Sequence, residues 1–306
     1  MNQTLNRRHF LQATGLGVGL AVGATDTLAR ADTVAPTAPA SIRLGMVTYN
    51  MGKDMTVVKL IRLCEATGLA GVELRTTHAH GVEVSLSAAE RAEVRKKFED
   101  AGIAIAGLGS AFEFHANDPD ELEKNIQGAI EYAQLAADVG APGIKVRPNG
   151  IPKDEDPEIT LERIGKAWGR VAAAAADKGV QVRMEVHGAE QTRSLPNIRK
   201  MLDYADHPNA RVCWNSNASD MDEQGNIRAN FDLVKHAIGL VHITEIGVYQ
   251  YPWQELFTLL KEINYTGFCL AEIAYNPEPE RFMRYYKTLF DLYTGGYRYP
   301  NPDVYA

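Results

Sequence analysis

The sequence predicts an α/β fold of the single (β/α)8-barrel class. One pattern recurs along the chain: a segment with helical spacing of apolar residues ends near a glycine, and a short apolar strand follows. Glycine is favoured after a helix because the backbone there often takes a positive φ. The glycines that mark this pattern are Gly68, Gly102, Gly140, Gly179, Gly239 and Gly267. Eight strand-and-helix steps within about 260 residues are typical of a closed parallel barrel.

The predicted strands cover about 42–48, 71–75, 103–108, 143–147, 180–187, 210–215, 239–244 and 268–273. Helical spacing of apolar residues separates them, for example over 53–68 and 118–140. Asp118 and Pro119 suit the N-cap and the first turn of the second of these helices. An open doubly wound sheet is the alternative, but no glycine-rich dinucleotide fingerprint follows the first strand. We therefore predict one barrel over residues 42–306 and no second domain.

The first 31 residues have the features of an export signal. Arg7 and Arg8 precede Phe10 and Leu11, a short glycine-rich apolar run follows, and Ala29-Arg30-Ala31 offers a small-x-small cleavage site. The paired arginines resemble a twin-arginine signal. Residues 32–41 are rich in Pro, Ala and Thr and read as a linker. The sequence therefore predicts a periplasmic or otherwise exported protein.

Charge and cysteine content limit the classes of partner. The formal net charge is −7, and removal of residues 1–31, which hold three arginines and one aspartate, would make it −9. This balance argues against nucleic acid and, once the signal is removed, against anionic membrane surfaces. Cys64, Cys213 and Cys269 are widely spaced and odd in number, so we expect buried thiols and no disulfide framework. The aromatic segment 293–306 could cover a neighbouring subunit in a homo-oligomer or the barrel itself.

Polar residues at the C-terminal ends of the strands are the candidate site residues, because active sites of this fold lie there. The candidates are Glu73 and Arg75, Lys145 and Arg147, Glu185 and His187, Asn215 and Asn217, His242 and Thr244, and Glu272. Residues two apart on a strand share a face, so both members of each pair can point inward. Trp214 could stack on a sugar ring or could equally face the helix layer.

Four consecutive strands supply Glu185, Asn215, His242 and Glu272. Two carboxylates, an imidazole and an amide oxygen suit a divalent Mn, Mg or Zn ion with positions open for substrate. Such an ion stabilises an enediolate, and a neighbouring carboxylate can take the proton from the adjacent carbon. The alternative is that Glu185 is an interior charge paired with Arg183 or Lys145. His242 could likewise be a satisfied core histidine, and Glu73 could belong to an ion pair at the rim.

The segments "GVELR", "VRMEVHG", "VCWNSN", "VHITEI" and "CLAEI" resemble the xylose isomerase-like TIM-barrel superfamily of sugar isomerases and epimerases. The resemblance implies a metal held by residues on strands five to eight, here Glu185, Asn215, His242 and Glu272, with the two glutamates as the acid/base pair. The chain departs from the pattern at Asn215, where the family has aspartate. It also has Ala218 and Val248 where ketose 3-epimerases have a histidine and an arginine that contact substrate.

The function expected from this resemblance is a metal-assisted carbohydrate isomerase or epimerase that abstracts a proton next to a sugar carbonyl. Glu73, Lys145, Arg147, His187, Asn217 and Trp214 are the expected substrate contacts. A lyase of 3-keto-glycosides on the same barrel is one alternative. A sugar-binding barrel that has lost its metal and its activity is the other, and Asn215 is the residue that favours it.

Overall fold

A computed structural model describes residues 42–247 and 250–297. Eight parallel strands close into one barrel in sequence order, and the last strand pairs with the first. The strands are β1 (Arg43–Val47), β2 (Gly71–Arg75), β3 (Ala104–Glu113), β4 (Gly143–Arg147), β5 (Gln181–Glu185), β6 (Ala210–Asn215), β7 (Ile238–Ile243) and β8 (Phe268–Ala271). The predicted single (β/α)8 barrel is confirmed. The predicted signal peptide (1–31), the linker (32–41) and the tail from residue 298 lie outside the described residues.

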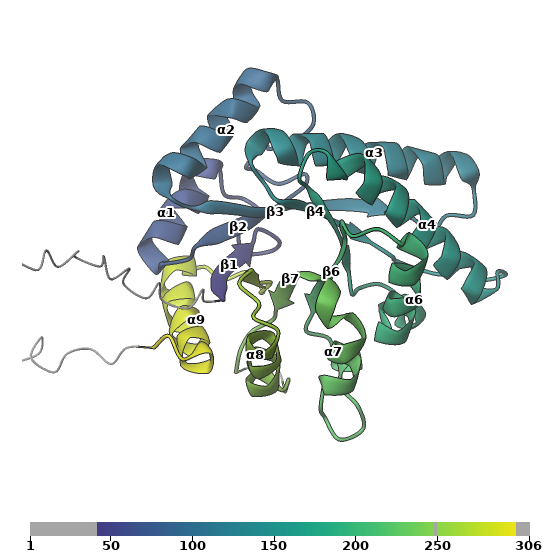
Figure 1. The fold of residues 1–306 in the computed structure, drawn as a ribbon. Helices are drawn as coiled ribbons and strands as arrows, with labels where there is room; N and C mark the ends of the chain where they lie inside the picture. Colours follow the sequence, from purple (N-terminus) through teal and green to yellow (C-terminus); the bar gives the residue numbers. More distant parts are fainter. Residues whose placement is uncertain (1–41, 248–249, 298–306) are drawn as a thin grey trace, which may run out of the picture. The chain divides into compact units, whose positions relative to one another are not determined.

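Helical segments follow every strand and cover the outside of the barrel (Figure 1). The α-helices are α1 (Val57–Thr67), α2 (Ala88–Ala101), α3 (Pro119–Val139), α4 (Pro157–Ala176), α5 (Glu190–Arg193), α6 (Leu195–Ala205), α7 (Arg228–Val234), α8 (Trp253–Glu262) and α9 (Pro279–Thr294). Two short 3-10 helices, η1 (Ala218–Asp220) and η2 (Lys235–Ala237), flank α7. No helix in the described part of the chain is both long and apolar enough to cross a membrane.

Local sequence fixes several helix ends. The predicted start at Asp118 is confirmed, because its side chain accepts hydrogen bonds from the backbone N–H groups of Asp120 and Glu121. Gly68 and Gly140 end α1 and α3 with φ values of 72° and 81°, as the glycine pattern predicts.

Two of the marker glycines do not terminate a helix. Gly239 lies inside β7, where an added Cβ would come within 2.8 Å of the Arg211 side chain. Gly267 precedes β8, and there an added Cβ would come within 2.4 Å of the Tyr265 hydroxyl. The glycine pattern is therefore wrong as a helix stop at these two positions, where close packing is the reason for glycine. Asn264 takes the positive φ, 53°, after α8.

Strand alternation divides the apolar residues into two cores. One core lies between the barrel and the helices and holds the outward strand residues, such as Met184, Val212 and Val241. The other fills the barrel interior with a cluster of six buried side chains: Val47, Ala106, Cys213, Leu240, Phe268 and Leu270. Inward residues that follow this cluster along the strands lie toward the C-terminal face of the barrel. The three cysteines are buried and free, as expected.

β3 is longer than predicted and continues to Glu113. The residues beyond 108 include Gly109, Ser110 and Ala111, which lack the strong apolar pattern that marks a buried strand. The pairing of β3 with β4 shifts register between Gly109 and Glu113, yet Glu113 still pairs with Arg147. This extension brings a carboxylate to the rim that the predicted strand did not contain.

Candidate active site

The four predicted ligand residues end neighbouring strands. Glu185 and Asn215 are the last residues of β5 and β6, His242 is next to the end of β7, and Glu272 directly follows β8. Asn215 pairs with His242 in the sheet register. All four follow inward-facing positions by two residues, so strand alternation brings them to the C-terminal end of the barrel interior.

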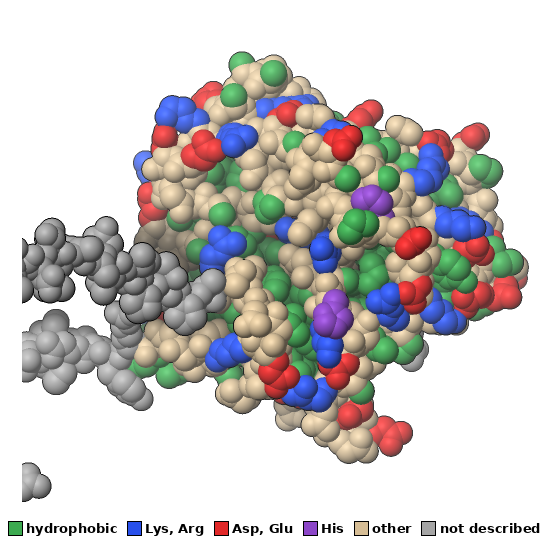
Figure 2. All heavy atoms as spheres, viewed as in Figure 1, with side chains coloured by type: hydrophobic (Ala, Val, Ile, Leu, Met, Phe, Trp, Pro, Cys, Tyr) green, Lys and Arg blue, Asp and Glu red, His purple; other side chains and the backbone are tan. Residues whose placement is uncertain are grey.

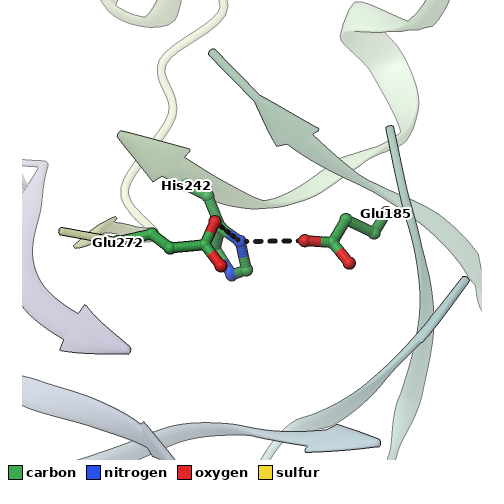
Figure 3. A group of neighbouring side chains, drawn as sticks. All are labelled: Glu185, His242 and Glu272. Atoms are coloured by element: carbon green, nitrogen blue, oxygen red, sulfur yellow. Dashed lines mark ion pairs between the residues drawn. The ribbon is translucent and has the colours of Figure 1, made fainter. Parts of the chain in front are cut away.

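Glu185 and Glu272 converge on one nitrogen of His242. The Nδ1 atom lies 3.5 Å from Oε1 of Glu185 and 3.4 Å from Oε2 of Glu272. One ligand atom from each residue lies within 4.8 Å of those of the other two. Figure 3 shows both carboxylates directed at the imidazole ring. His242 and Glu185 are buried, whereas the Glu272 side chain is 22% exposed, so the cluster opens on the Glu272 side.

The geometry of this cluster fits a divalent ion. Nδ1 of His242 is buried and makes no hydrogen bond with any described residue, although two carboxylate oxygens are near it. A buried nitrogen without a partner is costly, and a cation held by the three groups would satisfy it. Imidazole and carboxylate ligands suit Zn²⁺ or Mn²⁺. Glu185, His242 and Glu272 are therefore the residues that would hold the ion.

Asn215 stands beside this cluster. The residue is 7% exposed, and its side-chain amide makes no hydrogen bond within the described part of the chain. Its backbone oxygen accepts hydrogen bonds from the Asn217 backbone and side chain. The amide oxygen of Asn215 thus remains available as a neutral fourth ligand or as a contact for substrate.

Glu185 is also part of a buried ion pair. Nζ of Lys145 donates to Oε2 of Glu185 across 2.8 Å, and both side chains are almost fully buried. The interior pairing that the sequence left as an alternative is therefore present, and it coexists with the cluster because the other oxygen of Glu185 faces His242. Arg183 does not pair with Glu185; it donates to Oε1 of Gln181 and to the carbonyl of Ala106.

The neighbouring charges set the ionisation of the site. Burial opposes ionisation of Glu185, but Lys145 and His242 lower the pKa of its carboxyl below the usual value. Burial likewise opposes the charge on Lys145, whereas Glu185, Glu73 and Glu272 raise its pKa. For Glu272, the effect of burial is outweighed by His242, and its pKa is lowered. The structure thus favours two ionised carboxylates beside a charged lysine.

Glu73 occupies a different position from the predicted one. Its side chain is fully buried, and Oε2 lies 3.4 Å from Nε2 of His242. Glu73 therefore faces one ring nitrogen, whereas Glu185 and Glu272 face the other, Nδ1. The sequence predicts a substrate contact or a rim ion pair for Glu73. In the structure it faces the histidine, with no exposure to solvent.

Trp214 does not line the site. It is fully buried in the core between the barrel and the helices, where its ring packs edge-to-face on Phe231 of α7. Its Nε1 donates to the Tyr251 hydroxyl, which in turn donates to Asp220. The predicted stacking of Trp214 on a sugar is therefore wrong, because Trp214 lies between the inward residues Cys213 and Asn215 and so points outward.

The remaining predicted contacts lie around the mouth. Nη2 of Arg147 pairs with Oε1 of Glu113 at 2.9 Å, and Asn149 donates to the other oxygen of Glu113 at 2.6 Å. His187 is exposed directly after β5. The side-chain amide of Asn217 donates a hydrogen bond to the backbone carbonyl of Val186 at 2.7 Å.

Sequence reasoning missed Glu113 and Asn149 at the rim. The signal for Glu113 was that it lies two residues from Ala111 and four from Gly109, in phase with a continued strand.

Acidic and basic side chains are interspersed over the face shown in Figure 2. The negative net charge is thus not gathered into one patch on that face.

Comparisons with known proteins agree with this architecture. The sequence matches the xylose isomerase-like TIM-barrel family over residues 61–286, and the chain belongs to that family. A comparison with curated proteins finds no match.

Several solved structures share the fold. One is the 3-keto-D-glucoside 4-epimerase YcjR from E. coli, with 15% identity, a TM-score of 0.69, and coverage of 82% of this chain and 99% of that one. The IOLI protein with a bound zinc atom has 15% identity, a TM-score of 0.70, and coverage of 85% and 100%. A D-psicose 3-epimerase from Clostridium cellulolyticum H10 has 15% identity, a TM-score of 0.68, and coverage of 83% and 99%.

Proposed function

We propose that the protein is a divalent-metal-dependent carbohydrate isomerase or epimerase that abstracts a proton next to a sugar carbonyl. The observation that carries the proposal is the convergence of Glu185, His242 and Glu272 on one point at the C-terminal end of the barrel. Solved barrels of similar fold include sugar 3- and 4-epimerases, one with D-tagatose bound, and a protein with a bound zinc atom.

The residues of this chain divide the chemistry among them. Glu185 and Glu272 serve as the acid/base pair, since they approach His242 from two strands that β6 and β7 separate. Glu272 is the more exposed of the two and faces the mouth through which a sugar enters. A bound Mn²⁺, Mg²⁺ or Zn²⁺ would polarise the sugar carbonyl and stabilise the negative charge that develops on its oxygen.

Lys145 supports the same charge. An ammonium group has three donors, and one of them is used on Glu185 among the described residues. A second donor can reach a developing oxyanion in this buried part of the barrel, where such a contact has its greatest effect. Arg147 and Asn149, held by Glu113, and the exposed His187 contribute polar contacts to sugar hydroxyls at the rim.

The experiment that tests the proposal separates binding of metal from turnover. Metal content is measured by elemental mass spectrometry on mature protein, then Mn²⁺, Mg²⁺ or Zn²⁺ is added with ketoses and 3-keto-glycosides in D2O. We expect near-stoichiometric metal and deuterium incorporation at the carbon next to the carbonyl, detected by NMR. Glu185→Gln and Glu272→Gln should both abolish the exchange, whereas Glu93→Gln, which changes an exposed carboxylate on α2, is the control and should retain it.

Other outcomes would redirect the assignment. Release of an aglycone from a 3-keto-glycoside would indicate a lyase that uses the same proton abstraction. Sugar binding without metal and without deuterium exchange would indicate a non-catalytic barrel and would contradict the proposal.

We further propose that the protein acts outside the cytoplasm, after export by the twin-arginine route and removal of residues 1–31. The support comes from the paired arginines Arg7 and Arg8, the apolar run that follows and the small residues around Ala31.

A further inference from the structure

We propose that Glu73 is a positioning residue that fixes the tautomer and orientation of His242, so that Nδ1 is presented to the metal. The inference rests on the proposed function of the Glu185, His242 and Glu272 cluster. It assigns to a fourth buried carboxylate a role that is neither ligation nor substrate contact.

The two ring nitrogens of His242 face different partners. Oε2 of Glu73 lies 3.4 Å from Nε2, whereas Glu185 and Glu272 lie near Nδ1. A neutral imidazole has one N–H donor and one lone pair, and a carboxylate can only accept. Donation from Nε2–H to Glu73 leaves the lone pair on Nδ1, directed toward the cluster. A carboxylate on the second nitrogen also makes the first a stronger ligand.

The backbone around Glu73 is shaped to admit this carboxylate. Glu73 lies in the middle of β2 and faces β3, where two inward positions are Gly107 and Gly109. An added Cβ at Gly109 would lie only 2.8 Å from Oε1 of Glu73, and one at Gly107 would lie 3.6 Å from Oε2. Larger residues at Gly109 would therefore displace the carboxylate from its place beside His242.

No other ion pair accounts for Glu73. Among the described residues its carboxylate pairs with His242 alone, and Oε1 has no hydrogen-bond partner. Arg183 is nearby, but its hydrogen bonds run from Nε to Gln181 and from Nη1 to Ala106, and it forms no ion pair with Glu73. Lys145 and Arg183 compensate part of its charge from a distance. His242 is the one described residue within ion-pair distance of the Glu73 carboxylate, so we place the role of this buried group at the imidazole.

The test compares metal affinity in Glu73→Gln, Glu73→Leu and the control Glu113→Gln. Zn²⁺ and Mn²⁺ affinities are measured by competition with a chromogenic chelator, and folding is checked by circular dichroism and thermal unfolding without metal. We expect Glu73→Leu to weaken binding by about 10- to 100-fold, the usual effect of removing such a partner. Glu73→Gln should weaken it by less, because its amide oxygen still accepts from Nε2–H. Glu113→Gln should leave the affinity unchanged.

A direct readout of the tautomer distinguishes positioning from a general structural role. In protein labelled with 15N-histidine and loaded with Zn²⁺, His242, assigned by its loss in His242→Gln, should show an Nε2–H group and a metal-bound Nδ1. Metal-free Glu73→Gln, which is nearly isosteric, should show a mixture of ring states, because its amide can accept from Nε2–H or donate to an unprotonated Nε2.

Two failures can be told apart. If the wild-type protein binds neither metal, the proposed function fails, and this inference fails with it. If the wild type binds metal while folded Glu73→Leu or Glu73→Gln binds it equally well, or if the metal occupies Nε2, the positioning role alone is overturned.

Discussion

Lys145 donates from Nζ to Oε2 of Glu185 inside the barrel, and this 2.8 Å contact joins two adjacent strands. The pair leaves Oε1 of Glu185 directed at His242. Glu185 is thus held between a permanent cation on one side and the candidate metal position on the other. The ammonium makes it possible to keep a carboxylate ionised at 2% exposure before any metal arrives.

Removal of the lysine should destabilise the metal-free protein. Lys145→Met would leave the Glu185 carboxylate buried without its cation, a change that typically costs about 3–5 kcal/mol. Urea denaturation of metal-free protein at pH 7 should show this loss. The double variant Lys145→Met/Glu185→Gln should recover much of it, because neither charge is then buried. Equal stability of Lys145→Met and wild type would contradict the interior pairing.

The same ion pair predicts that the folded protein loses stability as pH falls into the acid range. The pKa of Glu185 is lowered in the folded state, so its contribution is present above the ordinary carboxyl pKa of about 4 and is lost as pH falls below it. Metal-free wild type should therefore lose stability toward pH 3 more steeply than the double variant. Thermal unfolding between pH 3 and 7 measures the difference, and parallel curves would contradict the assignment.

An aspartate at position 215, the residue that the family resemblance implies there, should strengthen metal binding at the candidate site. Asn215→Asp adds a carboxylate beside the cluster and should tighten Zn²⁺ or Mn²⁺ binding by roughly tenfold or more, since ligand charge is a main determinant of affinity. Chelator competition measures the change. Asn226→Asp, which adds the same charge on an exposed loop, is the matched control and should not alter the affinity. No tightening in Asn215→Asp would mean that residue 215 does not reach the ion.

Asp220 should make the free energy of unfolding fall as pH rises from about 4 to about 7. Burial raises the pKa of its carboxyl from 3.8 to about 7, although Asn217 and Tyr251 donate to it. The stability it contributes is complete below the unfolded pKa and is lost as pH rises toward 7. The stability of Asp220→Asn relative to wild type should therefore increase from pH 4 to about pH 7 and then level off.

Thermal unfolding across this range gives the comparison for Asp220. Asp54→Asn, at an exposed position, should show no such trend relative to wild type. A pH-independent difference between Asp220→Asn and wild type would contradict a raised pKa at this residue.

Export should depend on the paired arginines. Arg7→Lys/Arg8→Lys should keep the full-length chain in the cytoplasm, whereas the wild type should appear in the periplasm without residues 1–31. Fractionation with intact-mass measurement reads out both compartment and cleavage. Export of the double variant at the wild-type level would point to a route other than the twin-arginine one.

The barrel was predictable because its signals are local and repeat eight times. Apolar strands, helix caps such as Asp118 and positive-φ glycines such as Gly68 act within a few residues. The members of the candidate site were also predictable, since alternation along a strand determines which residues point inward. The same alternation places Trp214 in the outer core.

Side-chain contacts across the barrel interior could not be predicted from the sequence. The pairing of Lys145 with Glu185, and the facing of Glu73 with His242, join residues 40 and 169 positions apart. They depend on how far each side chain extends over the interior, which strand patterns do not encode. The length of β3 was missed for a related reason, because small residues such as Gly109 and Ser110 make room for neighbours and carry no strand signal.

The unequal burial of the two carboxylates makes their protons unequal in exchange. The Glu185 side chain is 2% exposed, whereas that of Glu272 is 22% exposed. In the proposed reaction, a proton on Glu272 would therefore exchange with the medium directly, while a proton on Glu185 would remain inside the barrel until it is transferred. Deuterium from the medium should then enter the product faster in the reaction direction in which Glu272 reprotonates the sugar than in the opposite direction.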